Sequence, residues 1–83
     1  MLSTPIVIPV FFYNDELKLK EDLGMDAPIE DAEVRDMHFF VINSVASYAD
    51  SEGKLVHTGI CSSGSTFISP WNLEKVLRAI NDI

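Results

Sequence analysis

Residues 39–68, FFVINSVASYADSEGKLVHTGICSSGSTFI, decide the fold of this chain. Two clusters of turn-forming residues, 50–53 and 62–65, interrupt this stretch, and each separates two runs whose composition favours β-structure. We therefore predict three short antiparallel strands joined by two hairpins, forming a meander within residues 37–69.

The same turns predict how the strands pair. A four-residue loop in the first hairpin would place Tyr48 opposite Leu55, Ala46 opposite His57 and Ile42 opposite Cys61, and the second turn would place Cys61 opposite Thr66 and Gly59 opposite Ile68. Side chains alternate between the two faces of a strand. One face would then carry Phe40, Ile42, Ala46, Tyr48, Leu55, Cys61 and Ile68, and the other Phe39, Val41, Val45, Val56, Ile60 and Phe67. Both faces of the meander are apolar.

A helix over residues 70–83 is predicted after the meander. Its apolar residues recur at helical spacing and form one stripe: Leu73, Val76, Leu77, Ile80 and Ile83. Ser69 has the side chain of an N-cap residue, and Pro70 suits the first helical position because its fixed φ matches the helix. We therefore expect the helix to begin near Ser69.

The segment before the meander has two parts. Residues 6–13 are rich in β-branched and aromatic side chains and predict a strand, which Pro9 restricts to a sheet edge or a bulge. Residues 14–36 contain nine acidic and three basic side chains, a local charge of 3 − 9 = −6. Within them, residues 15–23 fit a short helix that Gly24 ends, although Leu17 and Leu19 between lysines also fit a strand.

Together these elements predict an α+β fold: residues 1–83 form a single small domain, a mainly antiparallel sheet of about four strands with one C-terminal helix packed on it. Four strands span about 19 Å, whereas a helix is about 10 Å wide. The helix would cover about half of one face. The acidic segment could fold over part of the remainder, the sheet could close on itself, or a second copy of the chain could cover it. The candidate interface residues are Phe39, Phe40, Val41, Ile42, Tyr48, Ile60, Phe67 and Trp71.

Composition excludes several classes of function. Across 83 residues the formal net charge is −7, which disfavours nucleic-acid binding because that binding depends on cationic contacts. The single cysteine, Cys61, cannot form an internal disulfide, and this favours a reducing compartment, the cytoplasm. Residues 2–13 are apolar but lack a basic flank and fall short of the ~20 residues that span a bilayer. We therefore expect neither a signal segment nor a membrane anchor.

Reactive side chains are few. Cys61 and His57 would lie in one strand four residues apart, about 13 Å, which is too far for a thiol–base pair or a shared zinc ion. The loop at residues 62–65 leads into a strand rather than a helix, so it predicts a hairpin turn rather than a phosphate site. The acidic segment lacks the spacing of a calcium loop. We predict no catalytic residue, no cofactor and no metal, and a buried, inert Cys61 near Ile42.

Our hypothesis is therefore a non-enzymatic protein-interaction module that forms a homodimer through an apolar sheet face. Two alternatives remain open. The acidic segment at residues 14–36 could occupy a basic site on another protein, as an inhibitor or mimic does. The third hypothesis is a small thiol enzyme that uses Cys61.

Overall fold

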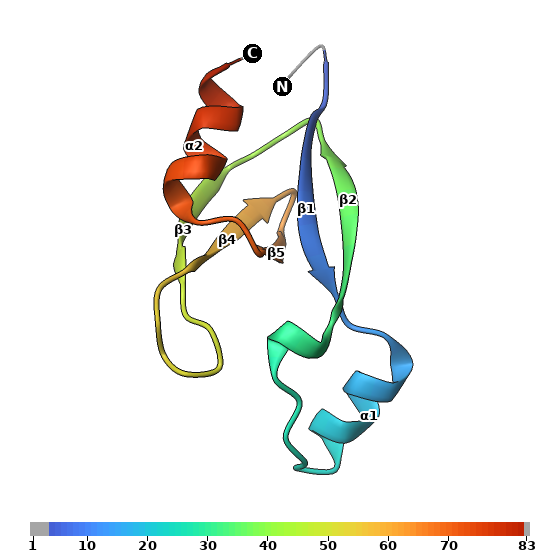
Figure 1. Cartoon of the computed structure of the whole chain (residues 1–83). Helices are drawn as coiled ribbons and strands as arrows, with labels where there is room; N and C mark the ends of the chain where they lie inside the picture. The colour runs from blue at the N-terminus through green and yellow to red at the C-terminus, as the bar shows by residue number, and fades with distance from the viewer. Residues whose placement is uncertain (1–3, 83) are drawn as a thin grey trace.

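The computed structural model describes residues 4–82 and confirms the α+β class (Figure 1). The prediction of one four-stranded sheet with a single helix is wrong. Five strands form a two-stranded sheet, β1–β2, and a three-stranded sheet, β3–β4–β5, and two α-helices and one 3₁₀ turn accompany them. Ile83, the last residue of the predicted helical stripe, and residues 1–3 lie outside the described part of the chain.

The first sheet pairs β1 (Ile6–Phe12) with β2 (Glu33–Phe39) in antiparallel register, from Ile6 opposite Phe39 to Phe12 opposite Glu33. The predicted strand at residues 6–13 is confirmed to within one residue, and Pro9 lies in a strand that is a sheet edge, as expected. β2 was not predicted and crosses the expected boundary between the acidic segment and the meander. Of its seven residues only Phe39 is buried, so its own sequence has no apolar alternation to reveal it.

The three-stranded meander is confirmed with later bounds: β3 (Ser44–Tyr48), β4 (His57–Ser62) and β5 (Ser65–Ser69). In the second hairpin, Cys61 lies opposite Thr66 and Gly59 opposite Ile68, as predicted. A two-residue turn closes it, with positive φ at Ser63 (51°) and Gly64 (85°).

The register predicted for the first hairpin is wrong by two residues. Cys61 lies opposite Ser44 instead of Ile42, and His57 lies opposite Tyr48 instead of Ala46. The carboxylate of Asp50 accepts hydrogen bonds from the backbone N–H groups of Glu52 (2.9 Å) and Lys54 (2.8 Å), so the turn closes where expected. Leu55 and Val56 then lie in the loop, exposed, rather than in a strand. Because the slip is even, each paired residue keeps its predicted face.

The C-terminal helix, α2 (Leu73–Asn81), is confirmed, but its predicted start at Ser69 is wrong. Asn72 is the N-cap, and its side-chain oxygen accepts a hydrogen bond from the backbone N–H of Lys75 (2.9 Å). Ser69 belongs to β5, and its hydroxyl oxygen accepts from the N–H of Trp71 (3.1 Å). Trp71 therefore precedes the helix instead of lying in its first turn.

One core joins both sheets to α2. Its buried residues are Ile6, Ile8 and Val10 of β1, Phe39 of β2, Ile60 of β4 and Val76 of α2. Val45 and Phe67, the cross-strand neighbours of Ile60, pack against this core. The helix therefore covers the meander face that carries Ile60, which the sequence left undecided. We call this the inner face, and β5 lies beside β1 where the two sheets meet (Figure 1).

The acidic segment folds at the end of the molecule away from α2 (Figure 1). Residues 15–22 form helix α1 (Asp15–Asp22), which resolves the choice between helix and strand, and the 3₁₀ turn η1 (Ile29–Asp31) leads into β2. Leu17 is buried, but Leu19, Leu23 and Met25 are more than half exposed, so α1 covers little of the sheet. The described chain measures 41 Å by 24 Å by 19 Å.

Candidate interaction surface

The eight candidate interface residues do not share one surface. Phe39 and Ile60 are buried in the core, and Ile42, Phe67 and Trp71 are half-buried and pack against it. Val41 is half-buried, and its carbonyl accepts a hydrogen bond from the Ser62 hydroxyl. Phe40 and Tyr48 are the most exposed members, at 51% and 47%.

The other meander face, which we call the outer face, carries Ser44, Ala46, Tyr48, His57, Gly59, Cys61, Thr66 and Ile68. A Cβ atom added at Gly59 would lie 3.7 Å from the Tyr48 ring and 3.8 Å from the Ile68 side chain. Tyr48 and Ile68 therefore flank the glycine backbone. Of these residues only His57 is buried, where its ring packs against Phe11, and α2 packs on the opposite face, so the rest of the outer face is open.

Strand β3 forms one edge of this sheet. Its sequence, SVASY, contains no charged residue and no proline, and four of its five residues are exposed. Edge strands of monomeric proteins are commonly protected by lysine, proline or a bulge, because an unpaired edge can pair with another chain. Among the described residues, β3 pairs only with β4. It carries none of the protective side chains.

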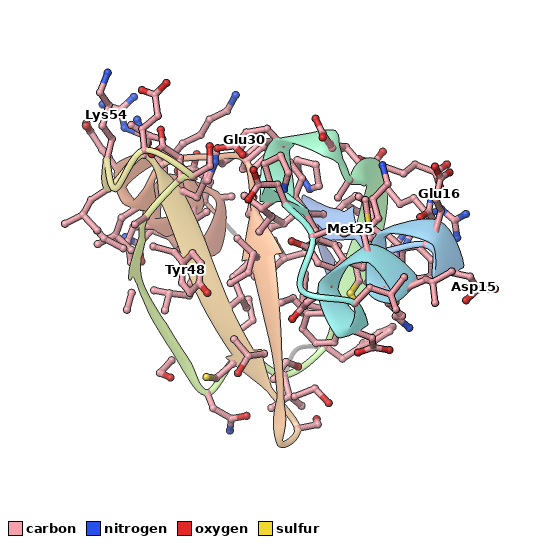
Figure 2. The ribbon with its side chains drawn as sticks, turned by 90° about the horizontal axis from the view of Figure 1, so that it is seen from below. Asp15, Glu16, Met25, Glu30, Tyr48 and Lys54 are labelled. Atoms are coloured by element: carbon pink, nitrogen blue, oxygen red, sulfur yellow. The ribbon has the colours of Figure 1, made fainter. Side chains whose placement is uncertain are left out.

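A cleft of about 830 Å³ opens between the acidic segment and the first hairpin. Its lining comes from two walls. The first wall consists of Tyr13 and residues 26–29, and the second of residues 47–51. The Tyr13 hydroxyl donates a hydrogen bond to the Ala27 carbonyl (3.1 Å), which holds the first wall together. Figure 2 shows Tyr48 on the hairpin side and Met25 on the α1 side of the molecule.

A smaller cleft of about 320 Å³ adjoins the first, and both are lined by Tyr13, Ile29 and Tyr48. It continues towards β5, where Thr66, Phe67 and Ile68 contribute to its lining. The two clefts therefore lie side by side, and we call them together the Tyr13–Tyr48 cleft.

The charged side chains that line this cleft are all acidic. Asp26 and Asp50 line the larger part and Glu21 the smaller part, whereas no lysine, arginine or histidine among the described residues lines either. Burial raises the pKa of Tyr13, and the nearby negative charge of Glu21 raises it further. Both effects oppose ionisation of the Tyr13 hydroxyl. The carboxylates give the cleft a negative charge, which attracts cations.

Glu30 connects the two walls. Its carboxylate accepts a hydrogen bond from the backbone N–H of Ser51 (3.0 Å) and lies 3.8 Å from Nε2 of His57. The Ser51 hydrogen bond holds the pKa of Glu30 below its usual value, and the nearby His57 lowers it further. The His57 ring packs edge-on against Phe11, with 5.1 Å between ring centroids. Neither ring nitrogen has a hydrogen-bond partner within the described chain.

Cys61 differs from its prediction. It is half-buried on the outer face opposite Ser44, not buried beside Ile42. Its sulfur lies 3.6 Å from the Thr66 hydroxyl. This hydrogen bond, followed by one with Ser44, lowers the pKa of the thiol, and partial burial opposes the shift. His57 contacts Phe11 and Glu30, so the structure does not pair it with Cys61.

No three residues of the metal-ligating types converge within residues 4–82. Over the same range, no helix has the length and apolar character needed to cross a membrane. The comparisons with family models, curated proteins and solved structures found no match to this chain.

Sequence reasoning missed most of the cleft. Tyr48 was a candidate, but Tyr13, Asp26 and Asp50 were assigned to a strand, an acidic connection and a turn. The sequence feature that could have indicated the cleft is Tyr13, an aromatic residue at the end of a predicted strand and directly before the acidic segment. Only the pairing of β1 with β2 brings Tyr13 next to residues 26–29.

Proposed function

We propose that this chain is a non-enzymatic protein-interaction module that associates with a second copy of itself along the free edge of β3. The observation that supports this proposal is an exposed, uncharged edge strand without proline or lysine. This proposal moves the contact between the two copies from the apolar face of the sheet, where our original hypothesis placed it, to the edge of the sheet.

Symmetry favours a second copy as the occupant. Two antiparallel β3 strands related by a twofold axis present the same residues to each other, so one self-complementary surface serves both copies. Backbone hydrogen bonds would then join two three-stranded sheets into one of six strands. Ala46 and Ser47 are small, so their side chains leave room for close approach of the backbones.

No charged side chain lies on the contact strand itself. Each copy carries a net charge of −7, but the five residues of β3 contribute none of it. A five-residue strand is a short contact, below the ~1,200 Å² of a stable interface, so we expect a weak dimer with a Kd of about 10–100 µM. The lone Cys61 and the absence of an internal disulfide support a cytoplasmic, reducing setting for this dimer.

Sedimentation equilibrium from about 1 µM to about 500 µM tests the proposal over the range in which such an interface forms. The wild-type chain should shift from monomer to dimer. Ala46→Lys should remain monomeric, because it places a lysine on each of the two facing edges. Leu19→Lys is the matched control: it makes the same change in net charge at an exposed position on α1 and should dimerise like the wild type.

A wild-type chain that stays monomeric throughout this range would refute the proposal. Equal dimerisation of Ala46→Lys and the wild type would also refute it, because the contact would then lie elsewhere than on β3. Circular dichroism spectra of both variants establish that each has folded before the comparison is made.

A further inference from the structure

We propose that the Tyr13–Tyr48 cleft binds an extended segment of another protein that carries several lysine or arginine side chains. The cleft adjoins the proposed dimer edge, because Ser47 and Tyr48 at the end of β3 line it, but the tests of the two proposals change different residues. In Figure 2, β3 lies on the side of the meander away from α1, whereas the cleft lies between the hairpin and the acidic segment.

The form of the cleft suits a chain rather than a single side chain. Its larger part measures about 830 Å³ and its smaller part about 320 Å³, and the two parts share Tyr13, Ile29 and Tyr48 in their lining. The cleft runs from the hairpin loop at residues 49–51 to the Thr66–Ile68 portion of β5. An extended polypeptide can follow this path, whereas a compact ligand would fill only one part.

The arrangement of charge determines which segment would bind. Asp26 belongs to one wall, Asp50 to the opposite wall and Glu21 to the far part, so three carboxylates are distributed along the path. A ligand with one positive charge could pair with only one of them. A segment with lysine or arginine at several positions could pair with each in turn, and charge complementarity of this kind gives both specificity and fast association.

The two tyrosines suit the same ligand. Tyrosine rings attract ammonium and guanidinium groups placed over their faces, by about 0.5–1 kcal/mol at exposed sites. Tyr13 is half-buried and Tyr48 is 47% exposed, so each can pack against the aliphatic part of a lysine or arginine. The apolar remainder of the lining, Ala27, Pro28 and Ile29, can contact those same methylene groups.

The walls are already joined before a ligand arrives. Glu30 connects η1 to the hairpin loop through the Ser51 N–H, and Tyr13 fixes residue 27 on the other side. A preformed cleft loses less conformational entropy on binding than two independent segments would. Nucleic acids are unsuitable occupants, because their phosphates would meet only carboxylates among the ionised side chains that line the cleft.

The test is a fluorescence anisotropy titration with a labelled peptide in which lysine and arginine alternate with serine. We expect binding with a Kd of tens of micromolar at about 50 mM salt and weakening of about 3- to 10-fold at about 300 mM, because salt screens the exposed charge pairs. A peptide with glutamate at the basic positions should not bind. Amide NMR shifts in the titration should concentrate at Tyr13 and at residues 26–29 and 47–51.

A charge-matched pair of double variants locates the site. Asp26→Asn with Asp50→Asn changes the net charge from −7 to −7 + 2 = −5, and should weaken peptide binding at least 10-fold. Asparagine at position 50 keeps an oxygen for the two loop hydrogen bonds. Asp36→Asn with Asp82→Asn makes the same charge change at exposed positions outside the cleft and should leave the affinity within about 2-fold of the wild type.

Several outcomes would overturn the proposal. Equal weakening by both double variants would show that net charge alone attracts the peptide. Shift changes centred on α1 instead of the cleft would place binding elsewhere. Spermidine that binds as tightly as the peptide would identify a small-polyamine site rather than a docking site for a protein. The dimer proposal would survive each of these results, because its test depends on Ala46.

Discussion

Truncation of two isoleucines on opposite faces of one sheet tests which face of the meander forms the core. Ile60 on β4 is fully buried among core residues, whereas Ile68 on β5 is half-buried on the outer face. Both are strand residues, so the loss of β-propensity in Ile60→Ala and Ile68→Ala is similar and largely cancels in the comparison.

The magnitudes follow from burial. Each change removes three carbon atoms, worth about 0.8 kcal/mol apiece when fully buried, or about 2.4 kcal/mol in total. At Ile60 the cavity that remains among Val45, Phe67 and Val76 raises the expected cost to about 3–4 kcal/mol. Ile68 is only half-buried, so its truncation loses about half of this transfer free energy, and solvent can fill the space that is left. We therefore expect Ile68→Ala to lower stability by about 1 kcal/mol. A difference of at least about 2 kcal/mol corresponds to about 30-fold in the unfolding equilibrium.

Urea unfolding at about 1 µM protein measures this difference below the concentration at which the proposed dimer forms. Trp71, the single tryptophan, is half-buried against the core and reports the transition by fluorescence. A chain of 83 residues has a total stability of about 4–12 kcal/mol, so Ile60→Ala remains measurable in the upper part of that range. Equal costs for the two variants, or a larger cost for Ile68→Ala, would refute our assignment of the inner face.

Three further predictions test local features. Asn72→Ala should lower stability by about 1 kcal/mol through loss of the N-cap, and unchanged hydrogen-exchange protection of the Lys75 amide would contradict it. Because the pKa of Glu30 is lowered below 4.5 in the folded chain, its carboxylate stabilises the fold above that pH, and the stabilisation is lost as the pH falls through the folded pKa. The stability difference between the wild type and Glu30→Gln should therefore shrink from pH 7 to about pH 3 in urea titrations, and a constant difference would argue against it. Thr66→Val should raise the pKa of the Cys61 thiol in a pH profile of iodoacetamide alkylation, and an unchanged profile would show that the hydroxyl has no effect.

The parts of the fold that could be predicted depend on short-range signals. The apolar stripe of α2 and the turn residues at 50–53 and 62–65 act within a few positions along the chain, and each led to a confirmed element. The error of two residues in the first hairpin arose because residues 55 and 56 look like strand residues, although the Asp50 hydrogen bonds close the loop before them. Because side chains alternate between faces with a period of two, a register shift of two residues leaves each paired residue on its predicted face.

The parts that could not be predicted depend on contacts between distant residues. β2 forms because β1 lies alongside it, and its own residues are mostly polar and exposed. The cleft requires two such contacts: Tyr13 with Ala27, and Glu30 with Ser51, which lies 21 positions away in the chain. Composition predicted the acidity of residues 14–36. It could not show that the hairpin loop would face that segment.

The acidic segment and the β3 edge differ in charge, and this difference predicts how salt affects each of the two proposed interactions. Residues 14–36 have a net charge of −6, whereas β3 has none. Screening reduces the interaction of exposed charges beyond about 8 Å at physiological salt, and the described chain is 41 Å long. In the proposed dimer, repulsion between the acidic segments of the two copies is therefore weak for charges that lie more than a few screening lengths from the β3 edge. At low salt the screening length grows to about 30 Å, so repulsion between the two copies should weaken the dimer. The same low salt should strengthen binding of a basic peptide in the cleft. This opposite response to salt distinguishes the two proposed interactions.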